Sequence, residues 1–182
     1  MKMFVNRPYR AGVRPFNLEA LKQHCRVDDE SETAALERIG YTAAREIEQF
    51  AQIALLTQAI RVTIFYGPAD PILTLPIGPS KEGERPTVSI NGAPFDSFDF
   101  VEGQRPVIVW GAAYFGLTPD VIIIEYNAGF GADAESIPHD LSEALLDQAA
   151  LHYDGRSPMD ARDLATSPHM ARIGARYRGV KI

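Results

Sequence analysis

The sequence predicts an α+β fold in which a small helical bundle carries an inserted antiparallel β region. Two amphipathic helical patterns, at about 30–55 and about 138–153, lie on either side of a stretch rich in short apolar runs, proline and glycine. No helical pattern separates the apolar runs of this middle stretch, about 59–126, so the βαβ units of a parallel sheet are not expected.

The chain is long enough for one domain with a hydrophobic core. Its 182 residues are 46% hydrophobic and 23% charged, which is ordinary for a globular protein. We expect a single domain over 1–160, with the β-rich insertion at about 59–126, and a C-terminal arm over 161–182. No apolar run reaches the roughly 18 residues that cross a bilayer, and the single cysteine excludes an internal disulfide.

Charge is unevenly distributed, although the total is only −6. Residues 1–14 carry +4 without any acid, and residues 161–182 carry five bases against one acid, again +4. The remaining part, 15–160, holds 9 bases and 23 acids, a net charge of −14. The pattern predicts an acidic body with two basic arms, and an acidic body disfavours DNA wrapped around the fold.

The helices follow from caps and periodicity. A short helix is predicted over 18–27, where Asn17 can cap the first turn. The long helix begins in the acidic stretch 28–32 and continues to about 55, because apolar residues recur at intervals of three and four. This stripe comprises Leu36, Ile39, Ala43, Ile47, Phe50 and Ala54.

The β region is predicted from six short segments. Apolar and polar residues alternate from Ile60 onward, and the pair Asn91-Gly92 marks a tight hairpin turn. The expected strands lie in QAIRVTIFY (58–66), ILTLPI (72–77), TVSI (87–90), DFV (99–101), PVIVW (106–110) and VIIIEY (121–126).

The last strong helix is predicted at about 138–153, followed by a basic tail with one short helix around 168–176. Two faces of the strong helix differ in character. Leu141, Leu145 and Ala149 form its apolar face, whereas Asp140, Glu143 and Asp147 are expected to form a solvated acidic face.

The loop EYNAGFGADAESIPHDL (125–141) raises the question of a phosphate site. Gly129, Gly131 and Ala134 fit the spacing G-x-G-x-x-G/A of a dinucleotide-binding turn. The helix begins only near Pro138, however, and the intervening acids would repel a phosphate. We therefore favour a strand-to-helix corner. A small nucleotide-binding enzyme that uses the Gly129–Gly131 loop is kept as an alternative.

Other signatures of catalysis are missing from the sequence. It contains no G-x-x-x-x-G-K-[ST], H-E-x-x-H or G-x-S-x-G motif, and its four histidines lack metal-ligand spacing. We expect no enzymatic activity, no catalytic residue, no metal and no cofactor. A DNA-binding module that uses the basic termini is the second alternative, and salt-sensitive binding to duplex DNA would favour it.

Two segments resemble the head–tail connector proteins of tailed phages, also called adaptor or head-completion proteins, which phage-like gene transfer agents also use. In 18–64 the likeness is an L-x-x-x-K-x-H-x-R-V-D start, an acidic cap, a long helix and the turn LLTQ into a strand. In 121–156 it is a strand followed by YNAGFG (126–131) and PHDL (138–141) at the start of a helix. The ending ARYRGVKI (175–182) is similar to the basic tail of the family.

The resemblance implies a structural role without catalysis. Members form a ring under the portal, twelvefold in the particle, that extends the DNA channel and docks the stopper or another tail-side connector. DNA would pass through the channel without sequence-specific binding, and no membrane partner is implied. The protein would reside in the virion or phage-like particle, at the head–tail interface, after assembly in the cytoplasm of the bacterial host.

The resemblance also implies where the portal binds, because C-terminal segments of the family reach into the portal. The expected portal-binding residues are Arg172, Arg176, Tyr177, Arg178 and Lys181. On this view, removal of residues 168–182 would leave a folded protein that no longer attaches to portal-bearing capsids.

Overall fold

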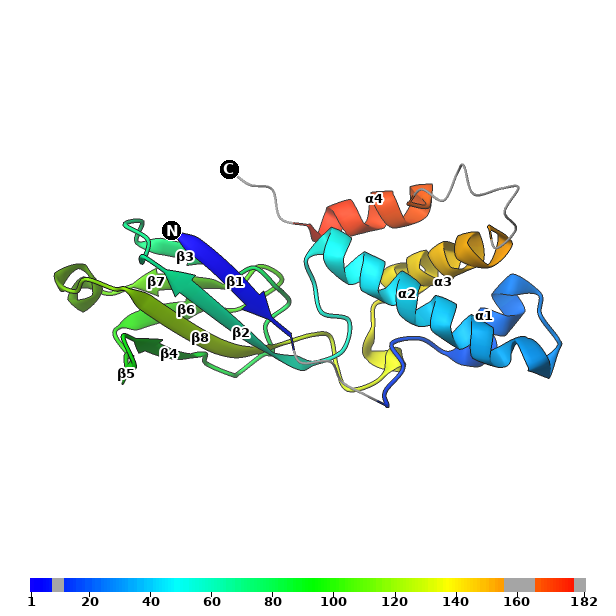
Figure 1. Cartoon of the computed structure of the whole chain (residues 1–182), viewed down its shortest axis with the longest axis horizontal. Helices are drawn as coiled ribbons and strands as arrows, with labels where there is room; N and C mark the ends of the chain where they lie inside the picture. The colour runs from blue at the N-terminus through cyan, green and yellow to red at the C-terminus, as the bar shows by residue number, and fades with distance from the viewer. Residues whose placement is uncertain (8–11, 156–165, 179–182) are drawn as a thin grey trace. The chain divides into compact units, whose positions relative to one another are not determined.

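A computed structural model describes residues 1–7, 12–155 and 166–178. The chain divides into two compact units (Figure 1). The β unit comprises Met1–Ala11 and Thr57–Gly129, and the helical unit comprises Gly12–Leu56 and Phe130–Ile182. The predicted α+β class with an inserted antiparallel β region is confirmed, and the β unit also takes in the N-terminal strand.

The described residues of the helical unit form four α-helices, of which α2, α3 and α4 pack on one another and α1 packs on α2 and α3 (Figure 1). The short helix expected around 168–176 is α4. The helical elements are α1 (Leu18–Cys25), η1 (Glu30–Glu32), α2 (Thr33–Ala51), η3 (Ala134–Ser136), α3 (His139–Asp154) and α4 (Pro168–Tyr177).

The core of the helical unit confirms the predicted apolar faces, because side chains spaced by three and four lie on one side of a helix. Most of the α2 stripe is buried, and so is the apolar face of α3. The fully or almost fully buried residues include Leu21 of α1, Leu36, Ala43 and Ile47 of α2, Leu141, Leu145 and Ala149 of α3, and Met170 and Ile173 of α4.

Helix α2 ends at Ala51, earlier than the expected residue 55. Gln52 has a left-handed backbone (φ 55°), and its N–H donates to the carbonyl of Glu48, as at many helix C-termini. The apolar pattern continued past this end because the following residues, Ile53–Leu56, are buried without being helical. The Glu48 carboxylate accepts the N–H of Leu55 (2.8 Å), which satisfies one backbone donor of this connection.

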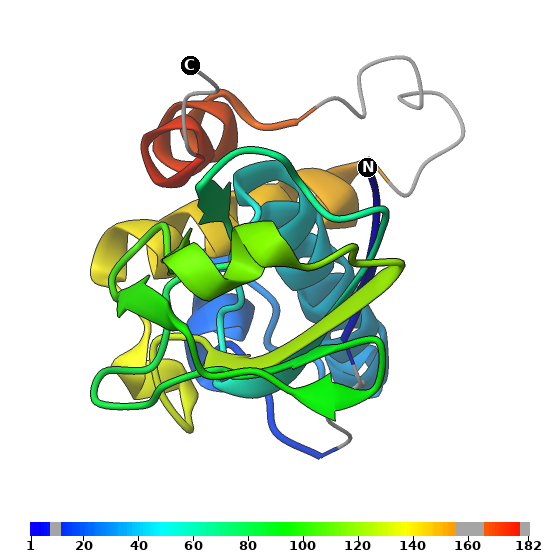
Figure 2. The ribbon, with the colours of Figure 1, turned by 90° about the vertical axis from the view of Figure 1, so that its left-hand side faces the viewer.

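The described strands of the β unit form two sheets, and all the pairings between them are antiparallel. One sheet has the order β1-β2-β8-β4-β5 and the other the order β3-β7-β6. The short helix η2 (Ala112–Gly116) follows β7 and lies at the front of the view in Figure 2. The strands are β1 (Lys2–Asn6), β2 (Gln58–Phe65), β3 (Ile72–Thr74), β4 (Thr87–Ile90), β5 (Ala93–Pro94), β6 (Phe98–Val101), β7 (Val107–Trp110) and β8 (Val121–Ala128).

Alternation along the strands buries one face of each sheet, and these two faces form the core of the β unit. Strands β2 and β8 pair from Gln58↔Ala128 to Phe65↔Val121, and every second residue of both is buried. The buried Tyr126 hydroxyl of β8 donates to the carbonyl of Ile77 (2.8 Å) and lies 3.2 Å from its N–H. This contact links the larger sheet to the segment that follows β3.

The strands β1 and β5 were not predicted from the sequence, whereas the turn at Asn91-Gly92 was. Residues 2–6 were expected to be part of a basic arm, but they form β1, paired with β2 at the edge of the sheet. The short β5 was not expected either. The predicted turn is confirmed: Asn91 (φ 51°) and Gly92 (φ 83°) join β4 to β5, with Ile90 paired to Ala93.

In the described part of the chain, no helix has the length and hydropathy of a membrane span.

Candidate functional site

The start of α4 is held by side-chain hydrogen bonds to α3. The Ser167 hydroxyl accepts the N–H of Met170 (3.0 Å), and Pro168 occupies the first turn, where a missing N–H costs little. The N–H of Ser167 donates to the side-chain oxygen of Gln148 (2.7 Å), which is only 2% exposed. A buried hydrogen bond therefore determines where α4 begins on α3.

One face of α4 is buried in the helical unit. Met170 and Ile173 belong to the core, and Gly174 brings the helix backbone close to α2. A Cβ atom at Gly174 would lie 2.5 Å from the Phe50 ring, closer than real contacts allow. Residues 168–178 are thus part of the packed helical unit, which differs from the arm expected over 161–182.

Two carboxylates of α3 bind the neighbouring helices. Asp140 accepts the hydroxyl of Tyr177 (2.9 Å) and lies 3.8 Å from the Arg176 guanidinium. Asp147 lies between His169 of α4 (2.5 Å) and His24 of α1 (3.0 Å). Of the acids expected to form a solvated face, Asp140 and Asp147 are only partly solvated: their side chains are 36% exposed and also have partners on other helices. Glu143, the third acid of the set, is exposed.

The residues expected to bind the portal divide into two groups. Arg172, Arg176 and Arg178 are exposed, whereas Tyr177 is half-buried. The Tyr177 ring packs edge-to-face against Phe130 at a centroid distance of 5.9 Å, and the Arg178 guanidinium lies 5.8 Å from the Phe50 ring centre. Lys181 lies outside the described residues. The three arginines are therefore exposed to solvent, whereas the Tyr177 side chain packs inward and holds α4 against the rest of the helical unit.

Replacing Tyr177 by Phe is expected to lower the free energy of unfolding by about 1 kcal/mol at neutral pH, because the hydrogen bond to Asp140 is lost. Burial, and then the Asp140 carboxylate, raise the pKa of Tyr177 to about 12. A raised folded-state pKa means that this contribution is complete below about pH 10, the ordinary tyrosine value, and disappears as the pH rises towards 12. Denaturation followed by circular dichroism from pH 8 to 12 measures the difference. A gap between wild type and variant that stays constant over this range would contradict the assignment.

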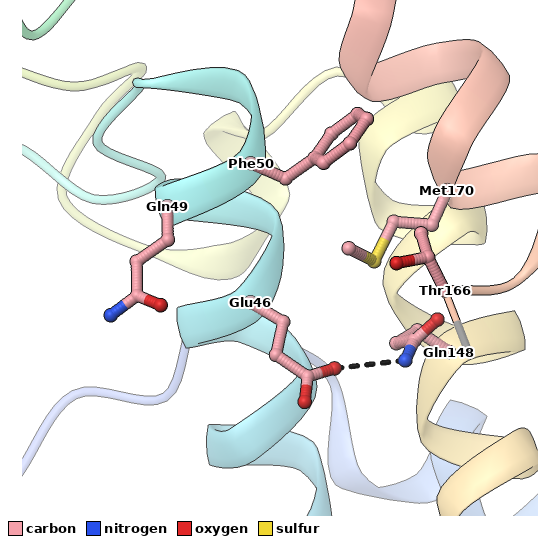
Figure 3. A pocket seen from close by; sticks show the side chains of 6 residues that line it. All are labelled: Glu46, Gln49, Phe50, Gln148, Thr166 and Met170. Atoms are coloured by element: carbon pink, nitrogen blue, oxygen red, sulfur yellow. Dashed lines mark hydrogen bonds between the residues drawn. The ribbon is translucent and has the colours of Figure 1, made fainter. Parts of the chain in front are cut away.

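A pocket of about 370 Å³ lies beside α4 and is lined by residues of three helices and of the segment before α4 (Figure 3). At its polar side, one oxygen of the Glu46 carboxylate accepts a hydrogen bond from Gln148 (2.8 Å) and lies 2.8 Å from His152. Both side chains across from Glu46 are more than 100 positions away in the sequence, so spacing gave no signal for this cluster. The lining residues are Glu46, Gln49, Phe50, Gln148, Thr166 and Met170.

In the glycine loop, the backbone groups make hydrogen bonds within the protein, and the space beside the glycines is filled by other residues of the chain. The N–H of Gly129 (φ 139°) donates to the carbonyl of Pro79 (2.9 Å). A Cβ atom on Gly131 would lie 2.1 Å from the Cβ of Ser136, whose hydroxyl donates to Asp133 (2.7 Å). The free amides and open space that a phosphate needs are therefore occupied, which favours the strand-to-helix corner over a nucleotide site. No group of three metal-binding side chains gathers in the described ranges.

Comparison with known proteins gives a consistent result. No protein-family model and no curated protein matches the sequence. Among solved structures, it matches a chain in the virion of a native gene transfer agent particle, with 25% identity and a TM-score of 0.77 over 98% of this chain and 96% of that chain. The chain is similar to a component of a gene transfer agent.

Two further matches come from the necks of such particles. A chain in the neck of the empty particle, computed with C6 symmetry, matches at 25% identity and a TM-score of 0.75, over 98% of this chain and 97% of that one. A chain in the neck of the native particle, computed with C12 symmetry, has the same coverage, a TM-score of 0.74 and 22% identity, which shows a shared fold. These two neighbours are thus components of particle necks.

Proposed function

We propose that this protein is a head–tail connector, or adaptor, that forms a ring under the portal of a phage-like particle. The ring would extend the DNA channel and dock the stopper or another tail-side protein. The observation that carries this proposal is the similarity, over 98% of the chain and with TM-scores up to 0.77, to components of gene transfer agent particles. Two of the matched structures described above are necks computed with rotational symmetry, which supports a ring.

The positions of the family-like motifs support the proposal independently. Leu55, from LLTQ, accepts the N–H of Phe130, from YNAGFG, at 3.2 Å, so the two motif segments meet in the helical unit. In PHDL, Asp140 binds Tyr177 and Leu141 is fully buried. These motif residues therefore take part in the packing of the helices and of the corner, which supports a structural role for them.

The charge distribution is consistent with a channel component. The chain has a net charge of −6, which disfavours tight binding of the DNA that passes through. The exposed side of α4 instead carries Arg172 and Arg176, Arg178 follows directly after the helix, and no acid lies between 166 and 178. We assign portal binding to these arginines together with Lys181, and we assign Tyr177 the role of holding α4 in place.

Electron cryo-microscopy of particles from cells that produce this protein tests the proposal. The expected result is ring density between portal and tail into which both units of this chain fit. Particles with complete necks and no density for this chain at that position would contradict the proposed function.

A further inference from the structure

On the outer face of the five-stranded sheet, two neighbouring rows are largely apolar and partly exposed, whereas the following row (Asn6, Arg61, Glu125) is polar; we call the two apolar rows face A. The side chains of Phe4 and Phe65 are 58% and 38% exposed, and their rings meet edge-to-face at 5.9 Å. Exposed aromatic pairs of this kind are typical of protein interfaces. The strand register defines two rows of face A across β1, β2 and β8, namely Lys2, Phe65 and Val121, and next to it Phe4, Thr63 and Ile123.

The outer face of the three-stranded sheet is also apolar; we call it face B. Ile72 and Val101 are 55% and 54% exposed, and two valines of β7 lie between them. The register again defines two rows, across β3, β7 and β6, namely Ile72, Val109 and Asp99, and next to it Thr74, Val107 and Val101.

Faces A and B point in opposite directions. Both sheets belong to the β unit, and each turns its buried face towards the common core, so the outward faces lie on opposite sides. They also carry opposite charges: Lys2 stands at the end of a row in face A, and Asp99 at the end of a row in face B. Neither of the two charged side chains has an ion-pair partner within the ranges that the structure describes.

We propose that face A of one copy packs on face B of the next copy, with Lys2 close to Asp99. This inference rests on the proposed function, because it names the contact by which the ring closes. Copies related by rotation meet through two different surfaces, one on each side of the subunit. A-to-B pairing can join these opposite charges and two apolar centres, whereas pairing of like faces offers Lys2 no acid and Asp99 no base from the two rows of either face.

Single charges placed in each face test the contact in the assembled particle. Phe4→Glu alters face A and Val101→Glu alters face B, and both sites are exposed, so we expect folded proteins with little change in melting temperature. Val13→Glu is the matched control, an exposed apolar residue (37%) of the helical unit. With each variant replacing the wild type in producing cells, microscopy should find ring-bearing necks at least about tenfold less often for both face variants, and unchanged for the control.

A charge exchange separates a specific contact from general damage. Lys2→Asp and Asp99→Lys should each reduce the fraction of complete rings, and both changes in one chain should restore it, because the ion pair re-forms with reversed polarity. Failure of the double variant to recover would overturn the Lys2–Asp99 contact.

The same experiment keeps this inference apart from the proposed function. If the wild type forms rings and either Phe4→Glu or Val101→Glu forms them equally well, the A-to-B contact is wrong and the proposed function stands. If the wild type gives no ring at all, the proposed function is wrong, and the A-to-B contact that rests on it is wrong as well.

Discussion

Replacing Arg172, Arg176 and Arg178 together by glutamate is expected to reduce capture by portal-bearing capsids at least about tenfold, because charges facing a partner govern encounter and binding. All three side chains are exposed, so each change should alter the free energy of unfolding by about 0.5 kcal/mol or less. The 3.8 Å contact between Arg176 and Asp140 is a surface ion pair and contributes little to stability.

Co-sedimentation of the purified variant with portal-bearing capsids measures the effect. The matched control pair is Arg38→Glu with Arg45→Glu, two exposed cations of α2, compared with Arg172→Glu and Arg176→Glu. Both double variants change the net charge by the same amount on the same helical unit. Equal losses in the two pairs would indicate general electrostatics instead of a site on α4, and undiminished capture of the triple variant would refute the portal assignment.

Removal of residues 168–182 is expected to destabilise the helical unit by about 4 kcal/mol, because the buried side chains of Met170 and Ile173 contribute about 2 kcal/mol each. The truncation would also remove Tyr177 and His169, the α4 partners of Asp140 and Asp147. The sequence led us to expect a folded truncated protein. The packing of α4 predicts instead that the truncated protein is less stable. Failure of this protein to attach to capsids would therefore not distinguish loss of stability from loss of portal binding.

Chemical denaturation followed by the helical circular-dichroism signal tests this prediction. Met170→Ala should reproduce about half of this loss, about 2 kcal/mol. Arg172→Ala, on the exposed side of the same helix, should change the free energy of unfolding by about 0.5 kcal/mol or less. A truncated protein as stable as the full chain would show that α4 adds nothing to the helical unit.

The elements predicted best are those with the most regular patterns. The stripe of α2 and the apolar face of α3 are buried as expected, and the alternation in β2 and β8 marks their inward faces. The strand β1 was missed because its residues are mostly exposed on both faces, so pairing with β2 and not burial defines it. The end of α2 was misplaced because buried residues continue beyond the helix.

The candidate site was predicted only in part. Sequence and resemblance identified the basic residues near the C-terminus, and three of them are exposed on or next to α4. No pattern indicated that Tyr177 would turn inward to Asp140, or that Asp147 would bridge two histidines. These partners lie on different helices, far apart in the chain, and no periodicity relates them.

The sequence by itself determined the class of the fold, the order of the strongest elements and the acidic body with basic ends, because hydrophobic period, turn residues and charge are local properties. Only the tertiary structure decided which polar groups meet and which apolar residues stay outside. Strand register decides that Phe4 and Phe65 share an outward face and that Ile72 and Val101 share another. Apolar residues alternate along a strand in the same way whether they face the core or an outer surface. Only the arrangement of all the strands shows which of these two sides an apolar residue faces.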